Sequence, residues 1–591
     1  MTHEAPVETP PQTGDFEVLI IGAGPVGLSS ALQLGRLGVN TLLVERRGGL
    51  SRHPKAGGIH ARTMEIFRRW DISDEIRSVG RGDLPPGVGP SGFAWVTRLS
   101  GIELGRIEFG LSPEDQKKWA SYSPEPPGFC GQDLYEPILF REVSRYPSVR
   151  VELARRASVV GQDDEGVSIV IEDEASGRSE LVRARYVIAC DGVRSPTRGA
   201  LGIGESGYGA FGDSISVQFR ADLEKHRRGR NFGLFWVANP DTQGAFTWRR
   251  RSDSWLYNFD PKPGEDAESY TADRCRDIIR KAVGDSDVGI EIESILPWKH
   301  DQAVSDAWRA GRVFLAGDAA HRFPPHGGFG MNSGVQDSVN LVWKLVLVLR
   351  GQAGDALLDT YEAERKPVAE FNGRQCLENT HRMEETGWLL RDPGSLADIE
   401  KPGLEGQAAR DRVAAAIPRQ REQFYSHGQQ FGSIYESAAV IPDGTEPERS
   451  TISDYYMTAH PGARAPHLWL TSPGGGELST LDLFGDGFVV LAGREGRAWR
   501  DAARSIGEGG AIPLTGYTVG LGGDFIERSE EKTLIALYGL APDGAVLVRP
   551  DGHVAFRSKT SVADAARALQ DALEALLGVR ASGHGRLAHA G

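Results

Sequence analysis

Cysteine is scarce in this chain of 591 residues, which contains only four of them. They are Cys130, Cys190, Cys275 and Cys376, and no two form a C-x-x-C pair. This pattern indicates neither a disulfide framework nor a cluster of metal ligands, so we expect no metal ion. Free thiols are typical of a reducing compartment, and the cytoplasm is the expected location.

Positive charge and long apolar runs are also lacking. Acidic residues outnumber basic ones by 81 to 67, and the net charge of −14 disfavours binding to nucleic acid or to an anionic membrane. No apolar run is long enough to cross a bilayer. Residues 1–14 are polar and proline-rich without the apolar core of a signal peptide, so we expect a disordered tail there and another at 579–591.

Hydrophobic residues still make up 40% of the chain, and glycine is abundant. The run Phe16–Gly22 (FEVLIIG) is typical of a buried parallel strand. A helical pattern follows over Ser29–Leu37, and Asn40–Glu45 (NTLLVE) predicts a second strand. Together these segments predict a β-α-β unit.

A G-x-G-x-x-G pattern occurs four times, but only Gly22, Gly24 and Gly27 follow a predicted strand and open a helix. In a dinucleotide fold these glycines allow a tight turn, a close approach of the pyrophosphate, and close packing of helix on strand. Glu45 ends the next strand, where it can accept a hydrogen bond from a ribose hydroxyl and would repel a 2′-phosphate. The motif therefore predicts FAD or NAD without choosing between them.

Two further segments make that choice. In YVIACDGVRSPTR, Asp191 and Gly192 end a predicted strand; in VFLAGDAAHRFPPHGGFGMNSGVQD, Gly317–Asp318 follow a strand and a glycine-rich loop leads into a helix. Taken singly, the first reads as a turn and the second as a helix cap. With the glycine motif, over residues 15–390, they resemble the group A flavoprotein aromatic hydroxylases, relatives of para-hydroxybenzoate hydroxylase that include phenol, dichlorophenol and polyketide hydroxylases.

The resemblance implies an FAD site. Asp318 is expected to bind the ribityl chain, and Gly330, Met331 and Asn332 the flavin ring, at the N-terminus of a helix that begins near Ser333. Asp191 and Gly192 would serve both FAD and NAD(P)H, with NADPH favoured, and Val159 would lie against the adenine. The further cofactor residues implied are Arg46, Arg62 in HARTMEIF and Gln132 in GQDLYEP.

The same resemblance implies an FAD-dependent monooxygenase that uses NAD(P)H and O₂ to hydroxylate a phenolic or related ring through a flavin C4a-hydroperoxide. A simple phenol, a hydroxypyridine and a polyketide all remain open as substrates. Pro325 is expected to present its carbonyl near the substrate, and His326 is either a proton shuttle or a loop histidine facing solvent. The phenol hydroxylases carry an aspartate where this chain has Gly57, so their base is in doubt here.

The remaining segments predict the rest of an α/β fold. Alternating, aromatic-rich strands over residues 206–299 predict an antiparallel substrate domain, whose aromatic residues are core first and pocket lining second. APHLWL, LFGDGFVVL and VLVRPDGHVAFR resemble the thioredoxin-like appendage of the family; without cysteine it is expected to form a homo-oligomer rather than exchange disulfides. The predicted domains are a Rossmann-type FAD-binding domain at 15–205 and 300–390, the substrate domain, a linker at 391–455 and the thioredoxin-like domain at 456–578.

Two rival functions stay open. The same flavin chemistry can insert oxygen beside a ketone, as in a Baeyer–Villiger reaction, or modify an aromatic antibiotic. A flavin-binding protein without turnover is the more remote alternative.

Overall fold

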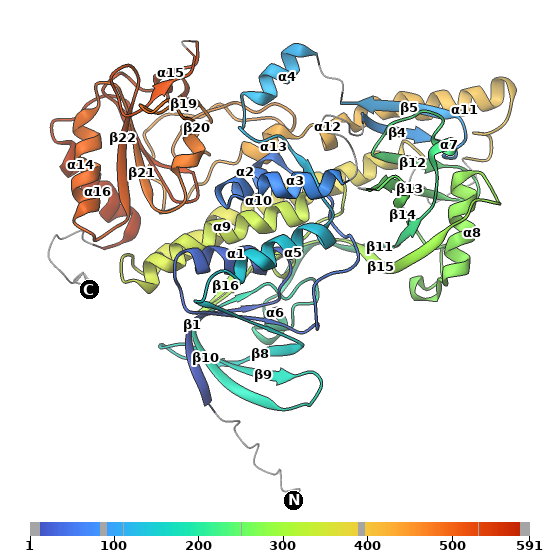
Figure 1. The fold of residues 1–591 in the computed structure, drawn as a ribbon, viewed down its shortest axis with the longest axis horizontal. Helices are drawn as coiled ribbons and strands as arrows, with labels where there is room; N and C mark the ends of the chain where they lie inside the picture. Colours follow the sequence, from blue (N-terminus) through green and yellow to red (C-terminus); the bar gives the residue numbers. More distant parts are fainter. Residues whose placement is uncertain are drawn as a thin grey trace, which may run out of the picture.

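The computed structural model describes residues 12–82, 91–109, 112–249, 251–387, 396–529 and 531–579. Two large sheets and a smaller C-terminal unit follow one another along the long axis of the molecule (Figure 1). The predicted tails lie outside the described residues, except that residues 12–14 already belong to the first strand and residue 579 follows the last helix.

The first sheet is parallel at its centre. Strand β1 (Gln12–Ile21) pairs in parallel with β10 (Ser179–Ala189) on one side and with β2 (Thr41–Glu45) on the other. Beyond them β17 (Val313–Leu315) and β7 (Val149–Leu153) extend the parallel arrangement. The predicted Rossmann-type architecture is confirmed, and it brings the carboxyl ends of β1, β10 and β17 to one edge of the sheet.

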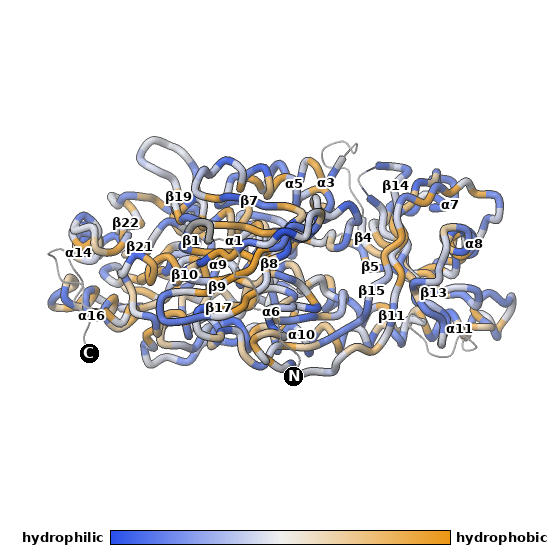
Figure 2. Tube along the Cα trace, turned by 90° about the horizontal axis from the view of Figure 1, so that it is seen from below, coloured by the Kyte–Doolittle hydropathy of each residue, from blue (hydrophilic) through white to orange (hydrophobic). Residues whose placement is uncertain are grey.

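Alternate residues of these strands are buried on opposite faces. Val18 and Ile20 pack against helices, whereas Leu19 and Ile21 pack against an antiparallel layer. Figure 2 shows hydrophobic stretches along the strands of this sheet. None of the described helices combines the length and apolar character of a bilayer-spanning segment. The covering elements are α1 (Pro25–Arg36), α5 (Gln132–Val143), α9 (Phe329–Leu349) and α10 (Ala356–Glu384) on one face, and β8 (Arg155–Gln162) and β9 (Val167–Asp173) on the other.

Two long antiparallel strands, β11 (Glu205–Arg220) and β15 (Glu291–Ser305), lead into the second sheet. It has eight strands, in the order β18-β15-β11-β14-β13-β12-β4-β5. The sequence boundaries put residues 92–108 in the FAD-binding domain, but their two strands pair in this sheet because an apolar strand carries no signal of its partner. The other strands are β18 (His321–Arg322), β14 (Ser254–Phe259), β13 (Gln243–Trp248), β12 (Leu234–Ala238), β4 (Gly92–Val96) and β5 (Glu103–Glu108).

The segment predicted as a linker, residues 391–455, is partly a folded cover for that sheet. Its helix α11 (Gly403–Ala416) lies beside β4 and β5 (Figure 1). Ile399 and Val413 are buried in one apolar cluster with Trp95 of β4. These few apolar residues in a polar stretch gave too weak a period to reveal the helix face.

The C-terminal unit has a four-stranded sheet with a helix layer, consistent with the predicted alternation of strands and helices. Its apolar core continues into α9 through Trp343 and Leu347. The unit is therefore packed firmly on the FAD-binding part rather than tethered to it. Its elements are β22 (Leu514–Val519), β21 (Phe488–Gly493), β24 (Ala545–Val548), β25 (Val554–Ser558), α14 (Arg497–Glu508) and α16 (Ala565–Leu577).

Candidate functional site

The turn between β1 and α1 needs glycine at two of its three motif positions. A Cβ on Gly22, whose φ is +102°, would lie 2.4 Å from the carbonyl oxygen of Cys190. A Cβ on Gly27 would lie 1.9 Å from the carbonyl oxygen of Gly22. Gly24 precedes the first residue of α1 and has open space beside it. The turn thus has the predicted geometry, with the N-terminus of α1 left accessible to a phosphate.

Glu45 fastens this turn to the end of β2. Its carboxylate accepts from the N–H of Ala23 (2.8 Å) and from Nε of Arg47 (2.8 Å). Although burial opposes ionisation, these hydrogen bonds hold the pKa of Glu45 below its usual value. Arg46, beside it, is exposed. The acid is ionised at the predicted ribose position, and that contact itself stays a prediction.

The second motif leaves a buried oxygen without a donor. Oδ2 of Asp191 accepts from the N–H of Thr197 (3.0 Å), whereas Oδ1 is buried and has no hydrogen-bond partner among the described residues. Gly192 follows with φ +84°, which only glycine adopts readily. Since an unsatisfied buried oxygen is costly, this position fits a ligand that donates a hydrogen bond.

The third motif meets the first at Val26. A Cβ on Gly317 would lie 2.7 Å from Cγ2 of Val26, and a Cβ on Gly334 of α9 would lie 2.5 Å from the same atom. Asp318 is exposed between the buried Gly317 and Ala319, and yet its position deep in the fold raises its pKa. Asp318 therefore faces an opening inside the molecule, where α1, α9 and the β17 turn converge.

Lys55 lies near the same converging segments, although no sequence motif singles it out. Burial lowers its pKa, while the carboxylates of Glu136, Asp318 and Glu45 oppose that effect. These acids come from α5, the β17 turn and the end of β2. The Lys55 ammonium is therefore close enough to interact with acids from three converging segments, and two of these acids, Glu45 and Asp318, are predicted cofactor residues.

The helix predicted to begin near Ser333 begins one turn earlier, at Phe329, because Gly328 adopts φ +72° and caps it. Asn332 thus lies in the first turn, after Gly330 and the half-buried Met331. Its amide is engaged with the backbone: Oδ1 accepts from the N–H of His60 (2.9 Å), and Nδ2 donates to the carbonyls of Gly58 (3.0 Å) and Gly328 (2.7 Å). The side chain of Asn332 therefore holds the helix start in place, and backbone N–H groups there remain the predicted flavin contacts.

Arg62 turns away from this space. Its guanidinium donates to Oε2 of Glu65 (2.9 Å) and to the carbonyl of Asp551 (3.0 Å) in the C-terminal unit. The side chain is almost fully buried by those contacts. The helix α2 (Ala61–Arg69) presents this arginine to a partner far away in the sequence, and the expected FAD contact stays a prediction that these contacts do not favour.

Gln132 and Val159 lie at opposite sides of the sheet. Gln132 is the first residue of α5, is buried, and donates to Glu136. Glu136 in turn accepts from the N–H of Ser51 (2.9 Å). Val159 is half-buried on β8, against the apolar layer that contains Leu19 and Ile21. Both stay predictions as cofactor contacts.

The loop of Pro325 and His326 differs from expectation. The Pro325 carbonyl accepts from the N–H of Gly328 (3.0 Å), so the turn uses one of its lone pairs. Thr380 Oγ1 donates its only proton to the Cys376 carbonyl (2.8 Å) and must therefore accept from Nδ1 of His326 (2.8 Å). Burial lowers the pKa of His326 to about 3. The histidine is buried, so the reading of a loop histidine facing solvent is wrong, and the proton-shuttle role stays a prediction that this lowered pKa does not favour.

His326 belongs to a cluster of neighbouring aromatic rings, which we call the His326 cluster: Trp236, Trp298, His300 and His326. The centroid of His326 lies 6.0 Å from that of Trp236 and 6.5 Å from that of His300, whose plane is tilted by only 6°. Trp298 lies 4.4 Å from His300. His300 escaped the sequence analysis because only the pairing of β11 with β15 brings it here.

Strand alternation decides which predicted aromatic residues reach this cluster. Phe235 and Val237 of β12 point into the core of the second sheet, so Trp236 between them points the other way. The predicted order, core first, is correct for the remaining buried rings. Those in the core are Phe232, Phe235, Phe246, Trp255 and Tyr257, with Trp248 packed against it.

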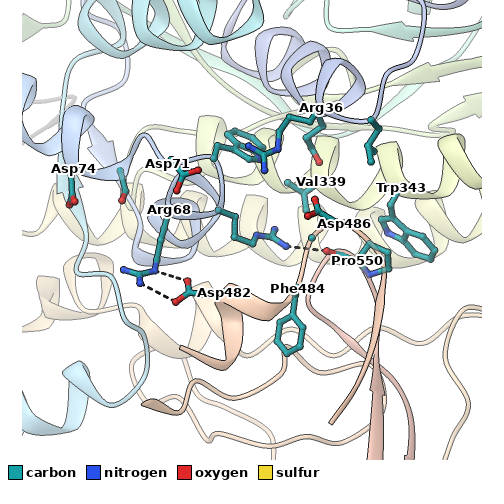
Figure 3. Close-up of a pocket in the computed structure, with 16 residues that line it drawn as sticks. Arg36, Arg68, Asp71, Asp74, Val339, Trp343, Asp482, Phe484, Asp486 and Pro550 are labelled. Carbon is teal, nitrogen blue, oxygen red and sulfur yellow. Dashed lines mark hydrogen bonds and ion pairs between the residues drawn. The ribbon is translucent and has the colours of Figure 1, made fainter. Parts of the chain in front are cut away.

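A separate cleft of about 540 Å³ lies between α2 and the C-terminal unit (Figure 3). Two of the three arginines that line it are already engaged, since Arg68 pairs with Asp482 (2.7 Å) and Arg69 donates to the carbonyl of Pro550 (3.0 Å). None of the motif glycines or acids lines it. The cleft is therefore distinct from the candidate site.

The sequence matches two family models, an FAD binding domain over residues 15–375 and an aromatic-ring hydroxylase C-terminal domain over 458–579. It is 37% identical to a tetracenomycin A2 monooxygenase-dioxygenase of Streptomyces glaucescens, over 97% of this chain and 98% of that protein. It is 36% identical to a 4-methyl-5-nitrocatechol 5-monooxygenase of a Burkholderia species, over 97% and 99%.

Among solved structures, the chain resembles the flavin-dependent monooxygenase PieE in complex with FAD and substrate, with a TM-score of 0.86, 33% identity, and coverage of 95% of this chain and 99% of that one. It also resembles aklavinone-11 hydroxylase with FAD and aklavinone, with a TM-score of 0.80, 33% identity and the same coverage. The chain belongs to the group A flavoprotein aromatic hydroxylases, monooxygenases that bind FAD, use NAD(P)H and O₂, and hydroxylate aromatic rings.

Proposed function

We propose that this monooxygenase hydroxylates a fused, phenolic polycyclic substrate of the polyketide type. One observation carries the proposal: the loop that follows Asp318 leads into a wall of neighbouring aromatic rings, the His326 cluster, in which His326 comes eight residues after Asp318. Wide aromatic walls suit a planar substrate of several rings. Relatives that act on tetracenomycin and aklavinone, and the PieE complex, support the same choice.

Gly57 argues against the simple-phenol alternative. No atom lies within 4 Å of the place where its Cβ would be, and its carbonyl accepts from the N–H of Cys130 (2.9 Å). The aspartate that serves as base in the phenol hydroxylases by resemblance therefore has no counterpart here. We assign that role instead to His300, whose Nε2 lies 3.6 Å from Oδ1 of Asp260. A carboxylate at that distance can help to orient the imidazole.

The residues present fit FAD. In this proposal the N-terminus of α1 beside Gly24 binds the pyrophosphate, Glu45 the ribose and Asp318 the ribityl chain. The donor-less Oδ1 of Asp191 and the exposed carboxylate of Asp318 are the observations that favour an absent partner rich in hydroxyl groups. When bound and reduced, the flavin supplies the electrons that activate O₂ for transfer to the ring.

The remaining residues shape the surroundings of the reaction. His326 stays neutral and donates its Nδ1 proton to Thr380, so it brings no charge to the ring wall. Trp236 and Trp298 exclude water from the same wall, which favours oxygen transfer over unproductive loss of the oxidising equivalent. We also propose NADPH as the preferred donor and a homo-oligomer formed through the C-terminal unit, both on the family resemblance.

A substrate panel tests the proposal. Hydroxylated anthraquinones and naphthacenes should accelerate NADPH oxidation by the FAD-loaded enzyme more than monocyclic phenols do, and the product should gain one oxygen as a new phenol. An ester seen by NMR would support the Baeyer–Villiger alternative. Firmly bound FAD with no acceleration by any aromatic compound would support the binding role. NADH compared with NADPH, and light scattering of the eluted protein, test the donor and the oligomer.

A further inference from the structure

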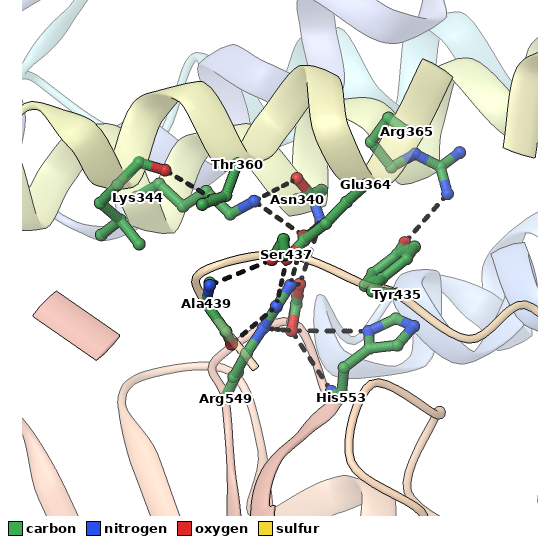
Figure 4. Close-up of polar contacts among 12 residues, drawn as sticks. Asn340, Lys344, Thr360, Glu364, Arg365, Tyr435, Ser437, Ala439, Arg549 and His553 are labelled. Atoms are coloured by element: carbon green, nitrogen blue, oxygen red, sulfur yellow. Dashed lines mark hydrogen bonds and ion pairs between the residues drawn. The ribbon is translucent and has the colours of Figure 1, made fainter. Parts of the chain in front are cut away.

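A buried network of ion pairs joins the C-terminal unit to α10 (Figure 4). At its centre Glu364 is fully buried and accepts from Nη2 of Arg549 (2.8 Å), Nζ of Lys344 (2.8 Å) and the hydroxyl of Ser437 (2.6 Å). Arg549 comes from the C-terminal unit and the other residues from the helices and the segment that follows them. Asp551 also pairs with Arg549, so two cations and two anions compensate one another inside the fold, where each needs its partners.

The network continues to the flavin side through Tyr435. His553 of the C-terminal unit stacks on this tyrosine with ring centroids 4.2 Å apart and planes tilted by 26°. The Tyr435 hydroxyl oxygen accepts from Nη1 of Arg365 (3.0 Å). Tyr435 therefore lies between a ring of the C-terminal unit and a buried arginine of α10.

Arg365 divides its guanidinium among three partners. Besides Tyr435, it donates from Nε to Oδ1 of Asp337 (2.9 Å) and from Nη2 to the carbonyl of Ser333 (3.3 Å). The side chain is 1% exposed. Both partners belong to the first half of α9, and Ser333 directly follows Asn332, one of the predicted flavin contacts. One planar group thus fixes the start of α9 relative to α10.

Asp337 passes the contact to the third motif. Its Oδ1 accepts from Arg365, while its Oδ2 accepts from Nε2 of His321 (2.7 Å) and from the N–H of Gly317 (3.3 Å). Gly317 immediately precedes Asp318. Against the effect of burial, His321 and Arg365 keep the pKa of Asp337 below its usual value, so it is ionised where it holds this turn.

We propose that Arg365 is a positioning residue for the flavin site: through Asp337 it orients the Gly317–Asp318 turn, and through Tyr435 it makes FAD affinity depend on the docked C-terminal unit. The inference rests on the proposed role of Asp318 in binding FAD. It gives the cysteine-free unit a function in cofactor binding that is separate from oligomer formation.

Tyr435→Phe is the sharpest test, because it removes the hydroxyl oxygen that Arg365 needs and keeps the ring that stacks on His553. We expect the dissociation constant for FAD to rise about fivefold, the lower range of coupling between sites. The measurement is a fluorescence titration of the full-length apoprotein with FAD, with the visible spectrum of the bound flavin as a second readout. Asp337→Asn, closer to the turn, should weaken FAD binding further.

Tyr455→Phe is the matched control. Tyr455 is also a buried tyrosine whose hydroxyl accepts from an arginine, Nη1 of Arg464 (3.3 Å), but that arginine pairs with Glu65 and not with Asp337. Both variants should lose stability to urea, and only Tyr435→Phe should lose FAD affinity. In a double variant with Asp337→Asn, the effect of Tyr435→Phe should shrink, since both act on one path.

Several outcomes separate the inference from the function beneath it. Equal FAD affinity in Tyr435→Phe, Tyr455→Phe and the wild type would overturn the inference and leave the proposed FAD site standing. If the Asp318→Ala variant binds FAD as tightly as the wild type does, the proposed role of Asp318 is overturned and the inference with it. If Tyr435→Phe fails to fold by circular dichroism, Arg365→Lys, which keeps the charge and loses the fork, must show the same loss of affinity.

Discussion

Replacing His326 by asparagine tests whether the loop beside the flavin motif carries a neutral imidazole. Asparagine can still donate a hydrogen bond to Thr380 from its amide, as Nδ1 of the histidine does at 2.8 Å. It removes the only group of this side chain that can take up a proton. The comparison of the two proteins therefore isolates the titration of His326 from every other buried histidine, because those are present in both.

The direction and the size of the expected change in unfolding free energy follow from the pKa of His326. In the folded protein it is lowered from 6.5 to about 3, so the unfolded chain takes up the proton first as the pH falls. The contribution to stability is complete above about pH 6.5 and is lost progressively toward pH 3. At pH 5 the wild type has lost about 2 kcal/mol, from about 1.5 pH units at about 1.4 kcal/mol each.

Urea unfolding of both proteins between pH 7.5 and pH 5 measures this difference. The variant should be less stable than the wild type at pH 7.5, because it loses the buried ring. At pH 5 the difference in unfolding free energy between the two proteins should be smaller by about 2 kcal/mol. Between pH 6 and 8, the turnover rates of the wild type and of the variant should depend on pH in the same way. The assignment of a neutral His326 would be refuted if the difference in unfolding free energy stayed constant with pH. It would also be refuted if only the wild type showed a change of turnover rate between pH 6 and 8.

Three further changes probe other parts of the site. Gly27→Ala would put a Cβ 1.9 Å from the carbonyl oxygen of Gly22 and should abolish FAD binding with a loss of about 2 kcal/mol or more in unfolding free energy; a yellow, fully stable variant would contradict the packing argument. Glu45→Gln should cost about 2 kcal/mol at pH 7, and since the native pKa is lowered from 4.5, the difference in unfolding free energy should shrink progressively as the pH falls below 4.5 in acid-unfolding curves. Trp236→Leu should raise KM for a polycyclic phenol about fivefold at unchanged FAD affinity, whereas loss of FAD would place this residue in the cofactor site.

The backbone conformations required at the glycine motif could be predicted from the sequence. The spacing of Gly22, Gly24 and Gly27 after an apolar strand encodes a turn that few other residues permit, so the parallel sheet and its helix followed from local pattern. The same holds for Asp191 and Asp318, which end strands of that sheet. Local sequence specifies these positions because their constraints involve neighbours in the same β-α unit.

Contacts between side chains from segments far apart in the sequence could not be predicted. The guanidinium of Arg62 donates to the carbonyl of Asp551, which is far away in the sequence. The protonation of His326 likewise depends on burial by α10 and the second sheet. The stack of His300 arises from strand pairing that no periodicity reveals. Long-range contacts of this kind are set by the whole fold, so a motif alone cannot supply them.

The short strand β18 has a mechanical consequence. It pairs with β15 through Val304 opposite His321 and Ala303 opposite Arg322, and His300 lies on that same strand. Because paired strands hold their residues at fixed separations, β15 and β18 join the His300 ring to the segment that begins three residues after Asp318. We expect a displacement of His300 by an aromatic ligand to be transmitted along this pair of strands toward the predicted cofactor site.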